Sequence, residues 1–361
     1  MDYFEELTIQ KTVKDRFINY ITAGRLAHAY LFYGPEGGGK EAIAIEIAKA
    51  LNCQNEATIP CNICASCTKI RQLIHPDIKF IIPESKSWST ADIRQKYKLK
   101  AENPYSRIEY TGTTSISIDK IRELKNEAKY TPYEAQKKVF ILTEAEKITR
   151  EGANSFLKLL EEPPDNLTIF LINNSLNTIL DTIKSRCQIV YFPPVAFDEA
   201  LSVVRKFHDI SDTERRIIRI SQGNLKHIFE NLNQDIDSKR RIVYDFLKAS
   251  ASGNAVKIQE AIEVIVQRRD KNFLLDVLNL LILWFEDVIH LVSAMENIEI
   301  INVDFEDEIK RFAKSYTNSD FEYIVAEIEK AVSNVRNNVY TPLLLTVLGI
   351  HIGNHLQRTR L

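Results

Sequence analysis

The chain has 361 residues, enough for two or three domains that each bury a core. Lysine and arginine number 47 against 49 aspartate and glutamate, and hydrophobic residues make up 45% of the chain. This composition is that of a soluble globular protein and excludes intrinsic disorder, a collagen-like repeat and a small disulfide scaffold. The net charge of -2 argues against a protein that coats DNA by charge alone.

The N-terminal segment begins acidic and has no apolar stretch followed by a small-residue cleavage site, so we expect a cytoplasmic protein. Residues 273–292 form the most apolar window. A membrane-spanning helix needs about 20 mostly apolar residues, whereas this window is interrupted by Asp276, Asn279, Glu286 and Asp287. We therefore predict a buried helix of a soluble core, and no membrane partner.

The first half of the chain alternates apolar runs with helical patterns, which predicts an α/β fold with a parallel sheet. Each run is apolar and bounded by polar or turn residues, as in strands that are buried on both faces. The runs that we expect to be strands are residues 29–34, 78–83, 138–143 and 167–173. A helix is expected over about residues 39–51. From Glu84 to Thr114 the chain is polar with scattered aromatic side chains, and we interpret this part as an extended insertion without a recognisable role.

The strand signals end at Pro193 and Pro194, and the rest of the chain has helical spacing. We therefore expect three domains of unequal length. They are an α/β domain over residues 1–195, a small helical domain over residues 196–240 and a larger helical domain over residues 241–361.

The segment from Gly34 to Lys40 reads GPEGGGK, and it lies between an expected strand and an expected helix. It matches the G-x-x-x-x-G-K spacing of a phosphate-binding loop. In such a loop the glycine N–H groups surround phosphate oxygens, and the lysine reaches the outer phosphates. Gly34, Gly39 and Lys40 are therefore candidate nucleotide-binding residues. A glycine-rich turn unrelated to nucleotides is the weaker alternative.

Two residues that a magnesium nucleotide needs are absent. A serine or threonine should follow Lys40, and the chain has Glu41. A carboxylate about 4 Å from a phosphate charge would cost on the order of 4 kcal/mol at an effective dielectric near 20. The run 138–143 should end in an acid, and it ends in Thr143, with Glu144 next. We therefore predict a nucleotide fold that does not hydrolyse ATP and does not bind ATP and Mg²⁺ tightly.

Four of the five cysteines lie close together, with the spacing C-x7-C-x2-C-x2-C. These are Cys53, Cys61, Cys64 and Cys67. Four thiolates can hold Zn²⁺ tetrahedrally, and such a closed site is structural. Ordinary free cysteines are an alternative, and a redox role for C-x2-C is a weaker one. The fifth, Cys187, is remote in sequence, and we interpret it as a small buried residue.

Four segments together resemble the AAA+ clamp-loader subunits of bacterial DNA polymerase III, a family that includes the delta prime and gamma/tau subunits. The segments are residues 28–40, the four cysteines, residues 151–164 (EGANSFLKLLEEPP) and residues 182–187 (TIKSRC). The resemblance covers about residues 1–230, and beyond that it rests on helical character and on residues 336–352. It implies an AAA+ domain, a helical lid and a helical collar that assembles a pentameric ring. The implied partners are the gamma/tau and delta subunits, the sliding clamp and primed DNA.

Ser185, Arg186 and Cys187 match the family's SRC motif, whose arginine reaches the ATP bound by a neighbouring subunit. The resemblance thus implies an arginine-finger role for Arg186, although an arginine taken alone would more often be a surface or salt-bridge residue. At the family's two sensor positions the chain aligns Asn174 and Lys226. The defects at magnesium favour the delta prime branch, a stator that donates an arginine and runs no ATPase cycle.

Two other functions stay open. An ATP-hydrolysing subunit of the gamma/tau type would have to tolerate Glu41 and Thr143. A stand-alone zinc-containing DNA-binding protein would bind DNA without partners, which the balanced charge and the lack of a recognisable reading helix disfavour. On the preferred hypothesis the chain has neither ATPase nor polymerase activity of its own and belongs to the polymerase III holoenzyme at the nucleoid.

Overall fold

The structure, a computed structural model, describes residues 2–4, 7–110, 112–232, 236–268, 270–293, 300–336 and 339–358. It divides into two compact units, one of residues 1–211 with 221–232 and the other of residues 212–220 with 233–361. Each unit is described by itself below. The division into three domains at about residues 195 and 240 stays a prediction.

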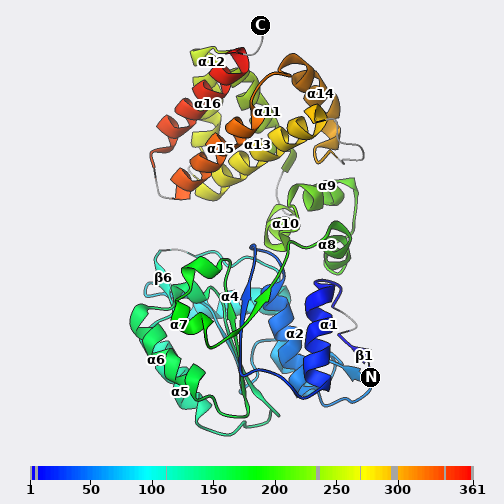
Figure 1. Cartoon of the computed structure of the whole chain (residues 1–361), viewed down its shortest axis with the longest axis vertical. Coiled ribbons are helices and arrows are strands. Elements are labelled where there is room, and N and C mark those ends of the chain that lie inside the picture. The colour runs from blue at the N-terminus through cyan, green and yellow to red at the C-terminus, as the bar shows by residue number, and fades with distance from the viewer. Residues whose placement is uncertain are drawn as a thin grey trace. The chain divides into compact units, whose positions relative to one another are not determined.

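The first unit is built around a five-stranded sheet in which every neighbouring pair is parallel (Figure 1). The strands are, in spatial order, β4 (Ile78–Ile81), β7 (Lys138–Leu142), β8 (Leu167–Ile172), β2 (Ala29–Tyr33) and β9 (Gln188–Tyr191). The predicted α/β fold with a parallel sheet is confirmed, and the four expected strands end one or two residues earlier than expected.

The fifth strand, β9, was not predicted. It lies at the edge of the sheet and pairs only with β2 among the described strands. Of its four residues only Val190 is buried, so it lacks the continuous apolar run that marks a strand covered on both faces. Two small strand pairs complete the unit. They are β1 (Asp2–Tyr3) with β3 (Thr58–Ile59), and β5 (Glu84–Ser85) with β6 (Thr114–Ser115).

Helices cover both faces of the sheet, with α5 and α6 on one side and α1 and α2 on the other (Figure 1). The helices of this unit are α1 (Lys11–Thr22), α2 (Lys40–Asn52), α3 (Ala65–Arg71), α4 (Thr90–Glu102), α5 (Ile118–Ala128), α6 (Arg150–Glu161), α7 (Asp181–Lys184), α8 (Phe197–Val204) and α10 (Leu225–Asn231), with 3-10 turns η1 (Ala145–Lys147) and η2 (Leu176–Thr178). On the α1 side, the ring centroids of Phe17 and Tyr30 are 5.0 Å apart, and those of Phe32 and Phe170 are 5.1 Å apart. This burial on two faces is the reason the central strands are apolar throughout.

The insertion between residues 84 and 114 contains helix α4, which its weak apolar periodicity does not indicate. The helix is polar, and its buried residue is Lys100. It begins with a capping box, because the Ser89 side chain accepts from the Asp92 N–H while the Asp92 carboxylate accepts from the Ser89 N–H. The pattern Ser89-x-x-Asp92 is a local sequence signal of this helix start.

In the second unit, every secondary-structure element of the described residues is a helix. Its helices are α9 (Asp212–Ile220), α11 (Ile236–Ala251), α12 (Ala255–Val266), α13 (Lys271–Val292), α14 (Glu306–Ser315), α15 (Phe321–Arg336) and α16 (Thr341–Arg358), with a 3-10 turn η3 (Val303–Phe305). Helix α13 is buried, as its apolar window predicted, and Phe285 and Val288 are inaccessible to solvent. The Asp287 carboxylate accepts hydrogen bonds from the Ile301 and Asn302 N–H groups, which accounts for an acid in this window. Among the described residues, no helix has both the length and the apolar character to cross a membrane.

Candidate functional site

The phosphate loop, residues 34–40, lies between the carboxyl end of β2 and the start of α2, as predicted. In open α/β sheets ligands bind beyond the carboxyl ends of the strands. Here the chain itself comes close to the loop. A Cβ atom added to Gly37 would lie 1.9 Å from Asn224 Oδ1, and the Leu225 N–H donates to the Gly37 carbonyl at 3.0 Å. The segment 221–232, which includes α10, therefore packs directly on the loop.

Lys40 is folded back onto the loop that precedes it. Its Nζ donates to the Gly34 carbonyl at 2.7 Å and to the Pro35 carbonyl at 2.6 Å, and the residue is 5% exposed. Burial, assisted by the charge of Lys226, lowers the pKa of Lys40 to about 8. The ammonium group is thus charged at neutral pH, and its charge is stabilised by backbone oxygens of the loop.

Glu41 lies between two lysines that come from distant parts of the chain. Its carboxylate accepts from Lys226 Nζ of α10 at 3.0 Å and from Lys100 Nζ of α4. Burial by itself would raise the pKa of Glu41, but the two lysines outweigh it and lower the pKa to about 2. Burial lowers the pKa of Lys100 to about 8, and attraction to Glu41 and Glu36 outweighs burial to raise that of Lys226. All three side chains are therefore charged at neutral pH.

Thr143, at the position where a magnesium-binding acid would be expected, is buried directly after β7. Its Oγ1 donates to the Ile81 carbonyl of the neighbouring strand at 3.2 Å. The next residue, Glu144, has a φ of 48° and pairs with Lys147 Nζ at 2.6 Å. The hydroxyl thus bonds within the sheet, and the following carboxylate has a lysine partner of its own.

The space left beside the loop has a volume of about 150 Å³, whereas small-molecule sites usually measure roughly 300–1,000 Å³. Asn174 and Lys226, the residues aligned with the two sensor positions, both line it. The insertion contributes a further part of the lining, which is Lys100, Pro104, Tyr105, Arg107, Ile108 and Tyr110. Sequence reasoning missed this contribution, because these residues follow the loop by 60 or more positions and carry no phosphate-binding pattern.

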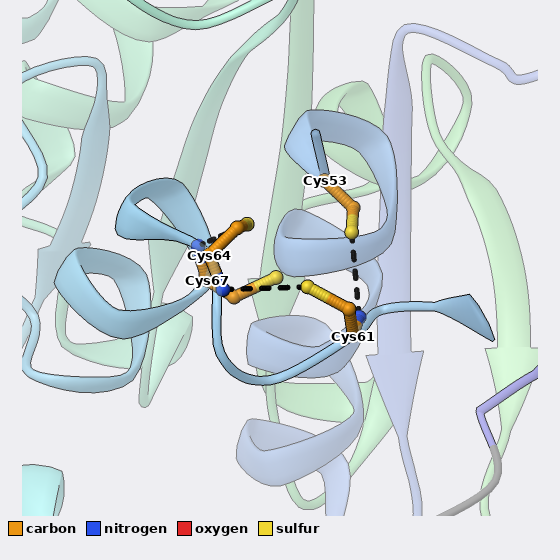
Figure 2. A group of neighbouring side chains, drawn as sticks. All are labelled: Cys53, Cys61, Cys64 and Cys67. Atoms are coloured by element: carbon orange, nitrogen blue, oxygen red, sulfur yellow. Dashed lines mark hydrogen bonds between the residues drawn. The ribbon is translucent and has the colours of Figure 1, made fainter. Parts of the chain in front are cut away.

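The four clustered cysteines meet in one place, as their spacing predicted. Cys53 follows α2, Cys61 lies in the next loop, and Cys64 and Cys67 lie at the start of α3. Their sulfur atoms point into a common space, and all lie within 4.8 Å of one another (Figure 2). Four sulfurs bound tetrahedrally at 2.3 Å from Zn²⁺ would be about 3.8 Å apart, so only small shifts separate this cluster from a metal site. The cluster could hold a metal ion.

Backbone N–H groups point at three of these sulfurs. The Cys61 N–H donates to Cys53 Sγ at 3.3 Å, the Cys64 N–H to Cys61 Sγ at 3.4 Å, and the Cys67 N–H to Cys64 Sγ at 3.4 Å (Figure 2). Burial opposes ionisation of Cys61, but such hydrogen bonds outweigh it and lower its pKa to about 7. Burial raises the pKa of Cys53 and Cys67. Bonds from N–H groups to sulfur favour thiolates and orient them as metal ligands.

Arg186 lies between α7 and β9, and its side chain is 34% exposed. Its Nε donates to Glu161 Oε1 at 3.0 Å, its Nη2 lies 2.6 Å from the same oxygen, and its Nη1 donates to the Thr182 carbonyl at 2.9 Å and to Ser185 Oγ at 3.1 Å. Among the described residues, those that line the space beside Lys40 do not include Arg186. Cys187 is partly buried, and burial raises its pKa to about 12.

Stability should depend on the ionisation of Glu41 in acid. A carboxyl whose pKa is lowered from 4.5 to about 2 contributes stability above pH 4.5 that is lost as the pH falls toward 2. The shift corresponds to about 3 kcal/mol. In urea unfolding, the advantage of the wild type over Glu41→Gln should therefore be constant from pH 7 to 5 and should shrink between about pH 4.5 and 2.5. An advantage that does not change with pH would contradict the charge pairing of Glu41.

The family model described as DNA polymerase III, delta subunit, matches residues 9–196, which are 188 of the 361 residues. The chain belongs to this family. The matched part contains the five-stranded sheet, the phosphate loop, the four cysteines and Arg186.

Individual relatives carry subunit names of the same polymerase. The chain is 27% identical to DNA polymerase III subunit delta' of Bacillus subtilis over 335 residues, which cover 92% of each chain. It is 26% identical to subunit tau of the same organism over 72% of this chain and 40% of that one. It is 31% identical to subunit gamma/tau of Mycobacterium tuberculosis over 51% of this chain and 27% of that one. The chain thus spans almost the whole delta' relative and less than half of the tau and gamma/tau relatives.

Proposed function

We propose that this member of the DNA polymerase III delta-subunit family works as a delta prime subunit of the clamp loader. It would be a stator that hydrolyses no ATP and donates Arg186 to the ATP of a neighbouring subunit while the sliding clamp is loaded onto primed DNA. The observation that carries the proposal is Glu41, which occupies the magnesium-binding position and is held there by Lys100 and Lys226. The similarity to a delta' subunit over 92% of each chain supports it.

The phosphate loop would keep its form without its ligand. Gly34, Gly39 and Lys40 complete the G-x-x-x-x-G-K pattern, but Lys40 donates to carbonyls of the loop itself. A triphosphate would have to enter a space of about 150 Å³ and face the Glu41 carboxylate. The loop would then serve as a structural turn between β2 and α2.

Arg186 would act on a neighbour. A guanidinium is a planar cation with five N–H donors, so it can neutralise the charge that develops on a transferring phosphoryl group. Part of the side chain is exposed, and contacts with Glu161, Thr182 and Ser185 fix its orientation at the surface. The partners of this proposal are the gamma/tau and delta subunits, the sliding clamp and primed DNA, in a three-domain cytoplasmic subunit whose helical C-terminal part forms the collar.

Replacement of Arg186 tests the proposal. In a loader reconstituted with the other subunits, Arg186→Ala should slow ATP turnover by about 10³-fold at the site that receives this arginine. The stimulated ATP turnover of the whole complex should fall by the fraction that this one site contributes to it. Arg186→Lys should not restore it, because lysine lacks the planar fork.

The control is Arg122→Ala, which removes an exposed arginine that pairs with Asp119 on α5. Gel filtration should show complete complexes with every variant. Unchanged turnover in a fully assembled Arg186→Ala loader would refute the finger role. Hydrolysis of Mg-ATP by the isolated wild-type chain would instead favour a gamma/tau-type subunit.

We propose that the metal at the four cysteines is Zn²⁺ in a closed structural site. Protein purified without chelator should contain about one zinc per chain. Cys64→Ser should lose most of this zinc and unfold at a lower temperature, because the metal contributes folding energy. Cys187→Ser, outside the cluster, should keep it. Elemental analysis that finds no zinc in the wild type, or an equal loss in both variants, would exclude the site.

A further inference from the structure

We infer that charged side chains of this chain take the place of a bound nucleotide in holding the segment 221–232 against the phosphate loop. The inference rests on the proposed function in one respect, namely that the loop carries no nucleotide. Six side chains form this internal clamp, two from each of three parts of the chain. They are Glu36 of the loop and Glu41 directly after it, Lys100 and Arg107 of the insertion, and Lys226 and Glu230 of α10.

The buried half of the clamp is centred on Glu41. Its carboxylate binds Lys100 and Lys226 at the same time, and the exposed fractions of the three side chains are 10%, 2% and 16%. A buried charge without a partner is strongly unfavourable, so loss of Glu41 would leave both lysines without their shared counter-charge, and loss of either lysine would weaken the compensation of Glu41. Glu41 thereby joins α2, α4 and α10 at one point.

The outer half of the clamp is centred on Arg107. Its Nη2 lies 2.9 Å from Glu36 Oε2, and its Nη1 lies 3.1 Å from Glu230 Oε2. Lys226 Nζ also lies 3.9 Å from Glu36 Oε1. Every pair among the loop, the insertion and α10 is therefore bridged by at least one ion pair.

Packing reinforces the ion pairs. The Tyr105 ring of the insertion stacks on Phe229 of α10, with centroids 6.1 Å apart and planes 12° from parallel. The Phe207 ring meets Phe229 edge-on at 5.2 Å. The Leu225 N–H also donates to the Gly37 carbonyl. Ring packing and this backbone hydrogen bond therefore hold α10 in place together with the ion pairs.

The charge balance explains why no anion is needed. The clamp has three carboxylates and three cations, so its net charge is zero, and Lys40 is satisfied by loop carbonyls. A nucleotide would place its negative charges close to the carboxylates of Glu36 and Glu41. It would have to separate Glu41 from both lysines before it could bind them. The closed position of α10 therefore belongs to the chain itself and does not depend on a nucleotide cycle.

Hydrogen exchange of the full chain, followed by mass spectrometry, tests this inference. In the wild type, the α10 amides should be protected without nucleotide, and millimolar Mg-ATP should not change their exchange. Glu41→Gln should speed their exchange by at least about tenfold. Arg107→Met, at a position that is 27% exposed, should speed it by a smaller factor while the protein stays folded.

The matched control is Lys79→Met, because Lys79 is 28% exposed and pairs with Glu127 at 3.1 Å away from the clamp. It should leave the α10 amides unchanged, and in every variant the amides of β7 and β8 should stay protected. If Glu41→Gln does not fold, Arg107→Met decides the matter.

Two results would overturn the clamp. In the first, the α10 amides of both Arg107→Met and Glu41→Gln exchange at the wild-type rate. In the second, adding Mg-ATP to the wild type slows the exchange of its α10 amides. The first, found together with an Arg186 finger that is active in the reconstituted loader, would refute the clamp and leave the proposed function intact. Steady ATP hydrolysis by the isolated chain would refute the proposed function itself.

Discussion

The buried carboxylate of Glu41 is the constraint on which the arrangement around the phosphate loop depends. A carboxylate that stays charged at this depth needs a cation, and the chain supplies two, from positions 59 and 185 residues further along. The polar insertion must therefore cross the mouth of the loop to deliver Lys100, and α10 must close on it to deliver Lys226. Glu41, at the position where a phosphate-binding loop would have a serine or threonine, thus sets the positions of the insertion and of α10. The arrangement leaves little space for a ligand.

The sheet provides the rigid base for this arrangement. Its central strands are buried on both faces, and aromatic rings from β2 and β8 pack against Phe17 of α1. The loop follows directly from β2, a central strand of that packing. The backbone at the start of the loop therefore cannot shift without disturbing the core. Because the base is stiff, ion pairs at its edge can fix the insertion and α10 in one place.

The parts of this structure that could be predicted from sequence are those with a local pattern. The four apolar strands, the loop and the cysteine cluster all lie where spacing and apolar character placed them. The role of the insertion could not be predicted, because apolar periodicity reports burial against a core and the buried residue of α4 is a lysine. That Glu41 disfavours a nearby phosphate stays a prediction; its lysine partners are set by the tertiary fold, and no local pattern contains them.

The proposed function asks one subunit to combine a fixed pocket with a partly exposed arginine that acts on a neighbour. An arginine that acts on a neighbour's phosphate must be held to within a fraction of an ångström, since a misplacement of about 1 Å can cost a hundredfold in rate. Arg186 projects from the turn before β9, and its orientation depends on Glu161 at the end of α6. Both elements belong to the same sheet-centred unit as the clamp. If that unit opened and closed with each nucleotide, the arginine would move with it. On the proposed function, charges that neutralise one another within the chain would keep Arg186 in place while a neighbouring subunit hydrolyses ATP.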